Sequence, residues 1–248
     1  MDFYDELAPY YHLIFDDWEN SINRQAKILD GIITSIWGED VTSIVDVACG
    51  IGTQAIGLAK RGYKIEASDI SQKAIERARE GSRKRKLDIS YSVSNMLEIS
   101  SNYPSQFDVL ICCDNSIPHL LSDQEIKQAF REFYQCLKPG GGCLITLRDY
   151  EKEKKTTHQI RPYKVQIHKG VKYILFQIWD FAGDIYDLSL YLITDDGQNE
   201  AVTKIFRTKY YAVTIPKVIK LVEEAGFARV KQVNSYFYQP VIVATKEL

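Results

Sequence analysis

The protein is a chain of 248 residues with a formal net charge of −2, and 45% of its residues are hydrophobic. This composition can fill the core of one large domain or of a domain with an insertion, whereas the near-neutral charge argues against nucleic acid or an anionic membrane as a partner. The sequence has no apolar run near the ~18 residues that a membrane span needs, and its start lacks the basic segment of a secretory signal, so we expect a cytoplasmic location.

Hydrophobic residues recur at helical intervals between Ser21 and Trp37 and predict an amphipathic helix before the first strand. After it, apolar β-branched runs alternate with helical segments, which is typical of a doubly wound, mostly parallel sheet. The predicted strands span 42–47, 63–68, 89–93, 107–112 and 142–147, and the predicted helices 53–61, 71–86 and 123–137. The last helix begins at Ser122 with Glu125 in capping-box register and ends at the stop signal Lys138-Pro139-Gly140.

A period-two pattern follows the charged run Glu151 to Lys155. Its segments near 163–167, 171–181, 185–194 and 201–212 are separated by turn signals and predict an antiparallel β meander. A helix at 216–225, closed by Gly226, and strands at 227–233 and 236–245 would then complete a seven-stranded Rossmann-like sheet. We expect a main domain of residues 1–150 and 213–248, and an inserted β subdomain of residues 156–212 that forms or caps the substrate site.

The five cysteines are odd in number and lie in apolar stretches, so we interpret them as buried free thiols. Cys112 and Cys113 are adjacent in a predicted strand, where their side chains point to opposite faces and form neither a disulfide nor a metal clamp. The four histidines are scattered, and no spacing of His and Cys indicates a metal site.

The segment Ile44 to Thr53, IVDVACGIGT, is the most informative part of the chain. A strand ends at Asp46 and continues into a glycine-rich turn and a helix, so that backbone N–H groups beside Gly50 and Gly52 can approach a ligand closely. Asp69 follows Asp46 by 23 positions, at the end of the next strand. In βαβ folds this interval places a carboxylate on the ribose hydroxyls of an adenosine.

The sequence does not match the glycine pattern of a dinucleotide site, because the spacing of Ala48, Gly50 and Gly52 departs from G-x-G-x-x-G. Asp46 has no function opposite a pyrophosphate, but an acidic residue suits a cation. S-adenosylmethionine (SAM) carries a sulfonium and an α-ammonium group, so the residues favour a SAM site over a nicotinamide cofactor and an oxidoreductase.

Ligands of such sheets bind at the carboxyl ends of the strands. Arg148 lies at one such end, where an unpaired guanidinium would be costly, so it either pairs with a carboxylate of the protein or grips an anionic substrate in two bonds. Asn115 could orient an amine or simply cap a turn. His119 could accept a proton, although a histidine that lines the cleft and bonds to the backbone or cofactor is the favoured interpretation.

The order of elements, with IVDVACGIGT, Asp69, Asn95 and LKPGGGCLI, resembles the class I SAM-dependent methyltransferases along nearly the whole chain. The segments FYDELAPYYHLIFDDW, CDNSIPHL and TLRDY resemble the glycine and glycine/sarcosine N-methyltransferases in particular. The resemblance implies the methyltransferase fold, SAM as cofactor and S-adenosylhomocysteine as product.

The same resemblance implies roles for individual residues. Tyr4, Arg24 and the backbone around Ala48 would hold the methionine end of SAM, Asp69 the ribose, and Asn95 with Met96 the adenine, while Cys113 and His119 would line the cleft. Asn115 and Arg148 lie where the family binds its amino-acid substrate. The expected catalytic residues are therefore Asn115, His119 and Arg148, and the expected cofactor residues are Tyr4, Arg24, Asp46, Ala48, Gly50, Gly52, Asp69, Ile70, Asn95, Met96 and Cys113.

We therefore expect a SAM-dependent methyltransferase that acts on the amine of glycine, sarcosine or a similar small amino acid. An O-methyltransferase of a small organic acid or phenol and a non-catalytic SAM-binding regulator are the alternatives. A nucleic-acid methyltransferase is disfavoured, because the chain has no NPPY-like tetrad after the fourth strand and no basic stripe. The expected partner is a small amine or carboxylate, with no nucleic acid and no membrane, and a homo-oligomer is left open. Aromatic residues, among them Tyr4 and Tyr11, would cap the cleft.

Overall fold

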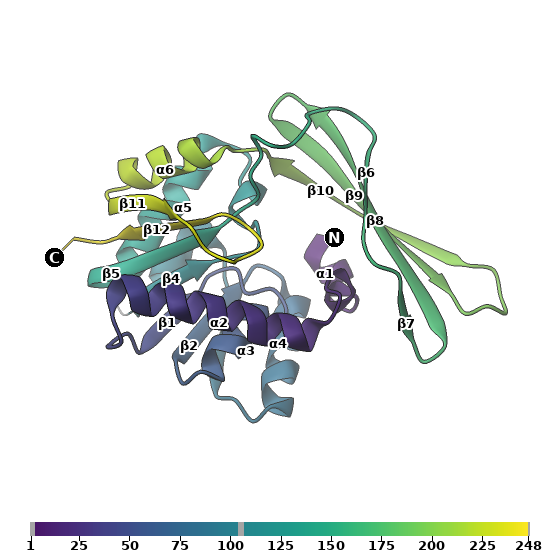
Figure 1. Ribbon diagram of the computed structural model, residues 1–248, viewed down its shortest axis with the longest axis horizontal. Coiled ribbons are helices and arrows are strands. Elements are labelled where there is room, and N and C mark those ends of the chain that lie inside the picture. The colour runs from purple at the N-terminus through teal and green to yellow at the C-terminus, as the bar shows by residue number, and fades with distance from the viewer. Residues whose placement is uncertain (1–2, 104–106, 248) are drawn as a thin grey trace.

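The computed structural model describes residues 3–103 and 107–247. The main sheet has seven strands in the order β11-β12-β5-β4-β1-β2-β3 (Figure 1). Strands β1 to β5 run parallel, β12 is antiparallel to β5, and β11 is antiparallel to β12. The predicted doubly wound, mostly parallel sheet with a reversed hairpin at one edge is thus confirmed. The strands are β1 Ser43–Asp46, β2 Lys64–Asp69, β3 Ile89–Val93, β4 Phe107–Cys112, β5 Leu137–Thr146, β11 Ala228–Val233 and β12 Val241–Thr245.

Helices cover both faces of this sheet (Figure 1). One face packs against α2 Trp18–Trp37, α3 Thr53–Ala59 and α4 Gln72–Lys84. The other packs against α5 Asp123–Cys136, α6 Ile215–Glu224 and the short helix η2 Met96–Ser101. Alternate residues of the strands enter the two cores: Ile44 lies in the first and Val45 in the second, as the two-residue period of a strand requires. None of the described helices is long and apolar enough to cross a membrane.

The helix ends follow local capping chemistry. α2 starts three residues before the predicted Ser21, because the Asp17 side chain accepts a hydrogen bond from the Asn20 backbone N–H at 3.0 Å. The predicted capping box of α5 is confirmed, since the Glu125 backbone N–H donates to Ser122 Oγ and the Glu125 carboxylate accepts from the Leu121 backbone N–H. α5 ends at Cys136, directly before the predicted stop signal at 138–140, but these three residues are strand and not loop, because β5 begins at Leu137 instead of the predicted 142.

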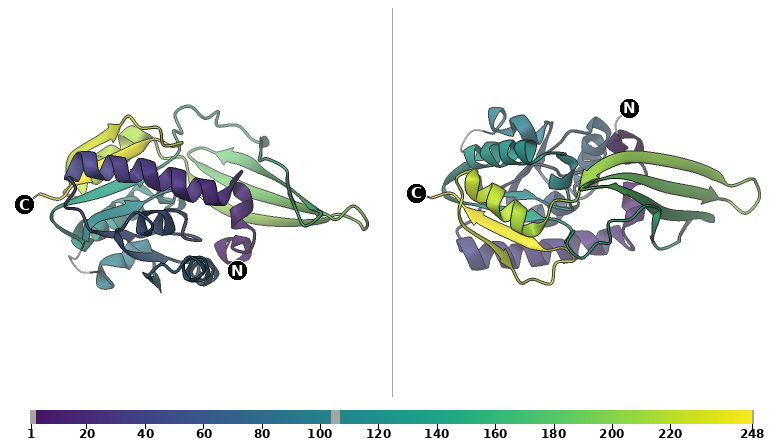
Figure 2. Two further views of the ribbon diagram at one scale, coloured as in Figure 1. Left: turned by 60° about the horizontal axis from the view of Figure 1, so that its bottom comes forward. Right: turned by 90° about the horizontal axis from the view of Figure 1, so that it is seen from above.

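The chain also forms a second, antiparallel sheet, which projects to one side of the main sheet in Figures 1 and 2. Its strands follow the order β10-β9-β8-β6, and β7 pairs with β8 beside β6. Of the predicted strand near 163–167, only Gln166–His168 is a strand, β7, and β6 at Gln159–Pro162 lies before it, where no strand was predicted. The strands are β6 Gln159–Pro162, β7 Gln166–His168, β8 Val171–Ala182, β9 Ile185–Asp195 and β10 Val202–Tyr211.

The N-terminal segment lies between the two sheets (Figure 1). It consists of α1 Phe3–Leu7 and the 3-10 helix η1 Tyr11–Ile14. Leu7 and Leu13 are buried in one cluster with Trp179, Tyr186 and other residues of the second sheet. The five cysteines are buried and free, as predicted.

Gly57 fixes how closely α2 approaches α3. A Cβ atom at this position would lie 2.6 Å from the Ala26 Cβ and 2.6 Å from the Ile22 carbonyl oxygen. Because the oxygen belongs to the backbone, the helices would have to separate, and we expect Gly57→Ala to lower the free energy of unfolding by ~1–3 kcal/mol. Gly31→Ala is the matched control, since a Cβ at Gly31 in α2 meets nothing within 4 Å, and it should be neutral or stabilising. Equal urea midpoints for the two variants would contradict this account.

Candidate active site

Two adjoining cavities lie where the strands of the main sheet end. The smaller has a volume of about 280 Å³ and the larger about 520 Å³. The smaller is lined by residues that follow β1, β2, β3 and β4, whereas the larger lies between α2, the end of β5 and the second sheet. Among the described residues, four line both cavities: Phe3, Tyr4, Tyr11 and Asp114.

Asp69 is held in place at the wall of the smaller cavity. One carboxylate oxygen accepts the Gly50 backbone N–H at 2.8 Å, and the other accepts the Ser71 backbone N–H at 2.9 Å. Gly50 has a φ of +52°, and a Cβ added to it would meet nothing within 4 Å. The turn after β1 and the end of β2 are therefore joined, and Gly50 presents open backbone to the cavity.

Gly52 has a different function from Gly50. Its φ is +89°, and a Cβ there would lie 3.1 Å from side-chain atoms of Ile56 and Tyr91 and 3.3 Å from Ala78. Gly52 is absent from the lining of both cavities. The prediction that both glycines admit a ligand must be corrected, because Gly52 instead lets the turn pack against its own helix, β3 and α4.

Three other predicted cofactor residues lie outside the smaller cavity. Asp46 is 1% exposed and Cys113 is 1% exposed, and neither lines a cavity. Burial raises the pKa of Asp46 to about 8, so this carboxyl group is largely uncharged at neutral pH and does not face a cation as expected. Arg24, on α2, lines the larger cavity.

The rest of the smaller cavity combines apolar side chains with an amide. Ile70 is 55% exposed and lines it together with Ala48 and Met96. Asn95 lines it too, and its Oδ1 accepts the Leu97 backbone N–H at 3.0 Å, which caps η2. Apolar side chains beside the fixed amide of Asn95 suit a flat heteroaromatic ring.

His119 connects the N-terminal segment to the second sheet. The hydroxyl of Tyr4 is 2.7 Å from His119 Nε2 and 3.2 Å from the Tyr210 hydroxyl, and the His119 and Tyr210 rings lie 4.1 Å apart. Burial lowers the pKa of His119 to about 4. The imidazole is therefore neutral at physiological pH, and it lines the smaller cavity only, which agrees with a cleft-lining histidine.

Asn115 joins the end of β4 to the end of β5. Its Nδ2 donates to the Tyr150 hydroxyl at 2.9 Å, and its Oδ1 accepts the Arg148 backbone N–H at 2.9 Å. Both polar ends of the amide thus have partners in the protein. Asn115 lines the larger cavity and fixes the backbone from which the Arg148 side chain extends.

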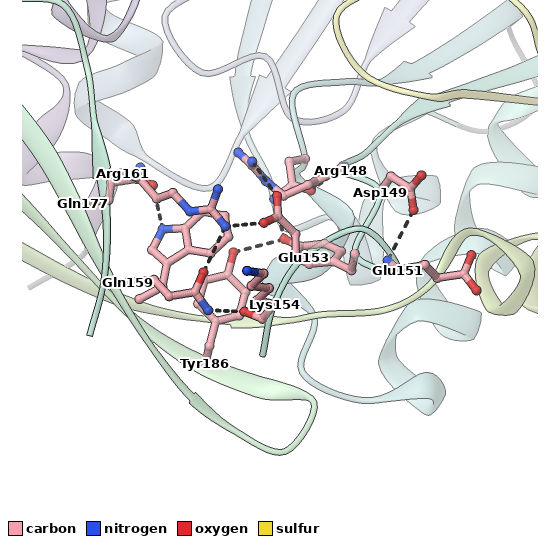
Figure 3. Close-up of polar contacts among 12 residues, drawn as sticks. Arg148, Asp149, Glu151, Glu153, Lys154, Gln159, Arg161, Gln177 and Tyr186 are labelled. Atoms are coloured by element: carbon pink, nitrogen blue, oxygen red, sulfur yellow. Dashed lines mark hydrogen bonds and ion pairs between the residues drawn. The ribbon is translucent and has the colours of Figure 1, made fainter. Parts of the chain in front are cut away.

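Arg148 belongs to a cluster of two guanidinium groups and one carboxylate (Figure 3). Its Nη1 is 3.3 Å from one oxygen of Glu153, and Arg161 pairs with the other oxygen. Both guanidinium groups lie 4.7 Å from the centre of the Trp179 ring. Arg148 lines the larger cavity, and its buried Nε has no hydrogen-bond partner among the residues that the structure describes.

Sequence reasoning missed Asp114. This residue follows Cys113 directly after β4 and lines both cavities. Burial raises the pKa of its carboxyl group to about 6, although a hydrogen bond from Gln54 opposes the shift. The available signal was an acidic residue at a strand end, immediately before Asn115.

Comparisons with known proteins show what kind of domain the chain contains. Residues 44–141 match a family model described as a methyltransferase domain. A glycine/sarcosine N-methyltransferase of Parasynechococcus marenigrum is 26% identical over 158 residues, which cover 62% of this chain and 56% of that protein. The chain thus matches little more than half the length of this relative.

Solved structures share the whole fold. The SAM-bound amino pentose methyltransferase of Micromonospora echinaspora has a TM-score of 0.78 at 16% identity and covers 91% of this chain and 92% of its own. Streptomyces venezuelae DesVI has a TM-score of 0.80 at 16% identity and covers 98% of each chain. Residues 44–141 therefore form a methyltransferase domain, and the chain has the fold of SAM-dependent methyltransferases.

The smaller cavity of the methyltransferase domain fits the adenosine part of SAM, the cofactor of this class. The fixed Asp69 carboxylate can accept hydrogen bonds from ribose hydroxyls, and Gly50 leaves space for the ligand beside it. Ile70 and Met96 offer apolar surface to the adenine, and Asn95 offers polar groups at its edge. When bound, SAM supplies a methyl group activated by a positive sulfur. No cluster of metal-ligating side chains occurs among the residues that the structure describes.

The two cavities of the methyltransferase domain meet under an aromatic cover. Phe3, Tyr4 and Tyr11 of the N-terminal segment line both, and the Tyr4 and Tyr11 rings lie 5.9 Å apart. Aromatic faces attract cations and exclude water. The junction can therefore hold a positively charged sulfur next to a second ligand in the larger cavity.

Proposed function

We propose that the protein transfers a methyl group from SAM to the amine of a small amino acid such as glycine or sarcosine. The observation that carries this proposal is the unpartnered Nε of Arg148 beside the larger cavity. A buried donor without a partner costs ~1–3 kcal/mol. A carboxylate that accepts from Nε and a terminal nitrogen would remove this cost and be held in a fixed orientation.

The charge of the cluster supports an anionic group in this place. Arg148 and Arg161 carry two positive charges, and Glu153 neutralises one of them. Trp179 holds both guanidinium groups by its ring, so Arg148 keeps its position when Glu153 is shared with Arg161. One net positive charge matches a single carboxylate.

Methyl transfer needs little more from the protein than alignment and the exclusion of water. The amine nitrogen uses its lone pair to form an N–CH₃ bond while the S–CH₃ bond breaks, and the sulfur keeps the electron pair, which leaves S-adenosylhomocysteine. Arg148 would orient the carboxylate end, and Asn115 would position Arg148 through its backbone N–H. The aromatic cover would seal the junction.

The comparisons support an amine as acceptor. One relative is named for methylating glycine and sarcosine, and one structural neighbour for methylating an amino pentose. The larger cavity, at about 520 Å³, exceeds what glycine alone would fill. Its Arg24 side lies at the start of α2, so we propose that part of this volume receives the methionine end of SAM.

Transfer of a labelled methyl group from SAM tests the proposal. Purified protein should methylate glycine or sarcosine, and acetate and phenol should accept no methyl group. Transfer to phenol or acetate alone would favour an O-methyltransferase instead. Calorimetric binding of SAM without transfer to any acceptor, dimethylglycine included, would favour a regulatory SAM-binding protein.

A further inference from the structure

Asp114 is the only carboxylate that lines both cavities among residues 3–103 and 107–247. Asp16 and Asp17 line only the larger cavity, at the start of α2, and Asp69 lines only the smaller. A methyl group that passes from one cavity to the other must cross this junction. Asp114 is therefore the acidic group best placed to meet the acceptor atom.

The backbone at Asp114 adopts a conformation that non-glycine residues rarely take. The φ of Asp114 is +62° and that of Asn115 is +64°. Thr146 of β5 holds both residues: its Oγ1 accepts the Asp114 N–H at 2.9 Å, and its carbonyl oxygen accepts the Asn115 N–H at 3.1 Å. Two successive residues in the left-handed region are costly, and here the cost places an acidic side chain at the junction.

The carboxylate of Asp114 has a fixed neutral partner but no cation. Gln54 Nε2 donates to its Oδ2 at 3.2 Å and to Gln25 Oε1 at 2.7 Å, and both glutamines are buried. No ion pair joins Asp114 to a Lys, Arg or His within the described part of the chain. A buried carboxylate without a counter-ion is unfavourable, so the site is suited to a ligand that brings a positive charge.

We propose that the Asp114 carboxylate binds the ammonium group of the substrate and accepts its proton, which frees the nitrogen lone pair for methyl transfer. The inference rests on the proposed function and deepens it, because Arg148 and Asp114 then offer one positive and one negative charge to a zwitterion. The N–H bond breaks, its electron pair stays on nitrogen, and the proton binds to an oxygen of Asp114. Asp114 releases this proton to water when the product leaves.

The raised pKa of Asp114, about 6, suits a base that works near neutral pH. The other titratable groups near Asp114 change charge in other pH ranges. Burial raises the pKa of Asp46, the last residue of β1, to about 8, and it raises the pKa values of Cys113, Tyr11 and Tyr163 above their ordinary values. Asp114 is thus the group at the junction that changes charge between pH 5 and 7.

Binding to the protein saturated with S-adenosylhomocysteine gives a test that needs no turnover. Glycine carries both charges, whereas acetate carries only the carboxylate. By calorimetry at pH 7, Asp114→Asn should weaken the binding of glycine at least about tenfold. The variant should bind acetate as tightly as the wild type does, or more tightly. Asp187→Asn, the same change at an exposed residue of β9, should alter neither. An equal effect on glycine and acetate would overturn the proposal.

The pH profile gives the second test. With labelled SAM and glycine, the wild-type kcat/KM should fall as the pH drops through about 6, because protonated Asp114 can neither pair with the ammonium nor take its proton. Asp114→Asn should lower the rate by about 10²- to 10⁴-fold and remove this acidic limb. If the wild type methylates glycine and Asp114→Asn keeps both the rate and its fall at acidic pH, the role of Asp114 is refuted and the proposed function stands.

The two ideas fail in different ways. If the wild type neither binds nor methylates glycine or sarcosine, the proposed function falls and this inference falls with it. Folding of the variant is checked by its melting temperature. Burial raises the folded-state pKa of Asp114 to about 6, so ionisation of Asp114 destabilises the wild type as the pH rises from the ordinary value of an aspartate through about 6. Asp114→Asn carries no charge and should therefore melt no lower than the wild type at pH 7.

Discussion

Arg148→Met is expected to lower kcat/KM for glycine about 30-fold or more and to leave the affinity for SAM nearly unchanged. Because the Arg148 side chain is 37% exposed, we take the lower end of the ~2–5 kcal/mol that truncating one partner of a buried charge pair costs. Each 1.4 kcal/mol corresponds to about a factor of ten. The loss should fall mainly on KM, because the guanidinium group contacts the carboxylate and not the reacting nitrogen. Initial rates with labelled SAM at varied glycine concentrations measure it.

Arg161→Met is the matched control for this experiment. Arg161 stacks on the same Trp179 ring and pairs with the same Glu153 as Arg148, but it does not line the larger cavity. Each variant leaves Glu153 with one arginine, so neither creates an unpaired buried carboxylate. We expect Arg161→Met to cost less than about tenfold. Equal losses in the two variants would mean that Arg148 supports the cluster rather than the substrate.

Most of the fold was predictable from the sequence because its signals are local. Alternating apolar strands and amphipathic helices specify a parallel sheet, and capping residues such as Ser122 and Glu125 mark helix starts. The boundary between α5 and β5 was not, since Lys138, Pro139 and Gly140 resemble a loop. Their strand conformation depends on the pairs with β4 on either side, Leu137 with Phe107 and Gly142 with Val109, and on the Gly140 N–H that donates to the distant Lys246 carbonyl.

The site shows the same division between local and distant information. Asp69 ends β2 and Asn95 comes shortly after β3. Both line the smaller cavity because the carboxyl ends of parallel strands lie at the same edge of the sheet. The different functions of Gly50 and Gly52 depend on Tyr91 and Ala78, which come from other elements. No spacing in the sequence indicates that Glu153 would be shared by Arg148 and Arg161, because β6 brings Arg161 back to the end of β5 only in the folded protein.

Asp69→Asn is expected to weaken SAM binding about 100-fold. Both oxygens of Asp69 already accept backbone N–H groups, from Gly50 and Ser71, and a carboxylate has further lone pairs for ribose hydroxyls. Asparagine replaces one acceptor oxygen with an NH₂ group that would face the N–H donors or the hydroxyls. A hydrogen bond to a charged group contributes ~1.5–3 kcal/mol, so losing the charge and one acceptor accounts for a change of this size in Kd, measured by calorimetry.

A ligand analogue separates contact with the ribose from damage to the turn. S-adenosylhomocysteine without its two ribose hydroxyls should bind the wild type and Asp69→Asn with equal, weakened affinity if Asp69 acts through the hydroxyls. If the variant binds this analogue far more weakly than the wild type does, the turn around Gly50 has lost its shape, and Asp69 acts through the backbone instead. The two outcomes distinguish a carboxylate that contacts the cofactor from one that only joins β1 to β2.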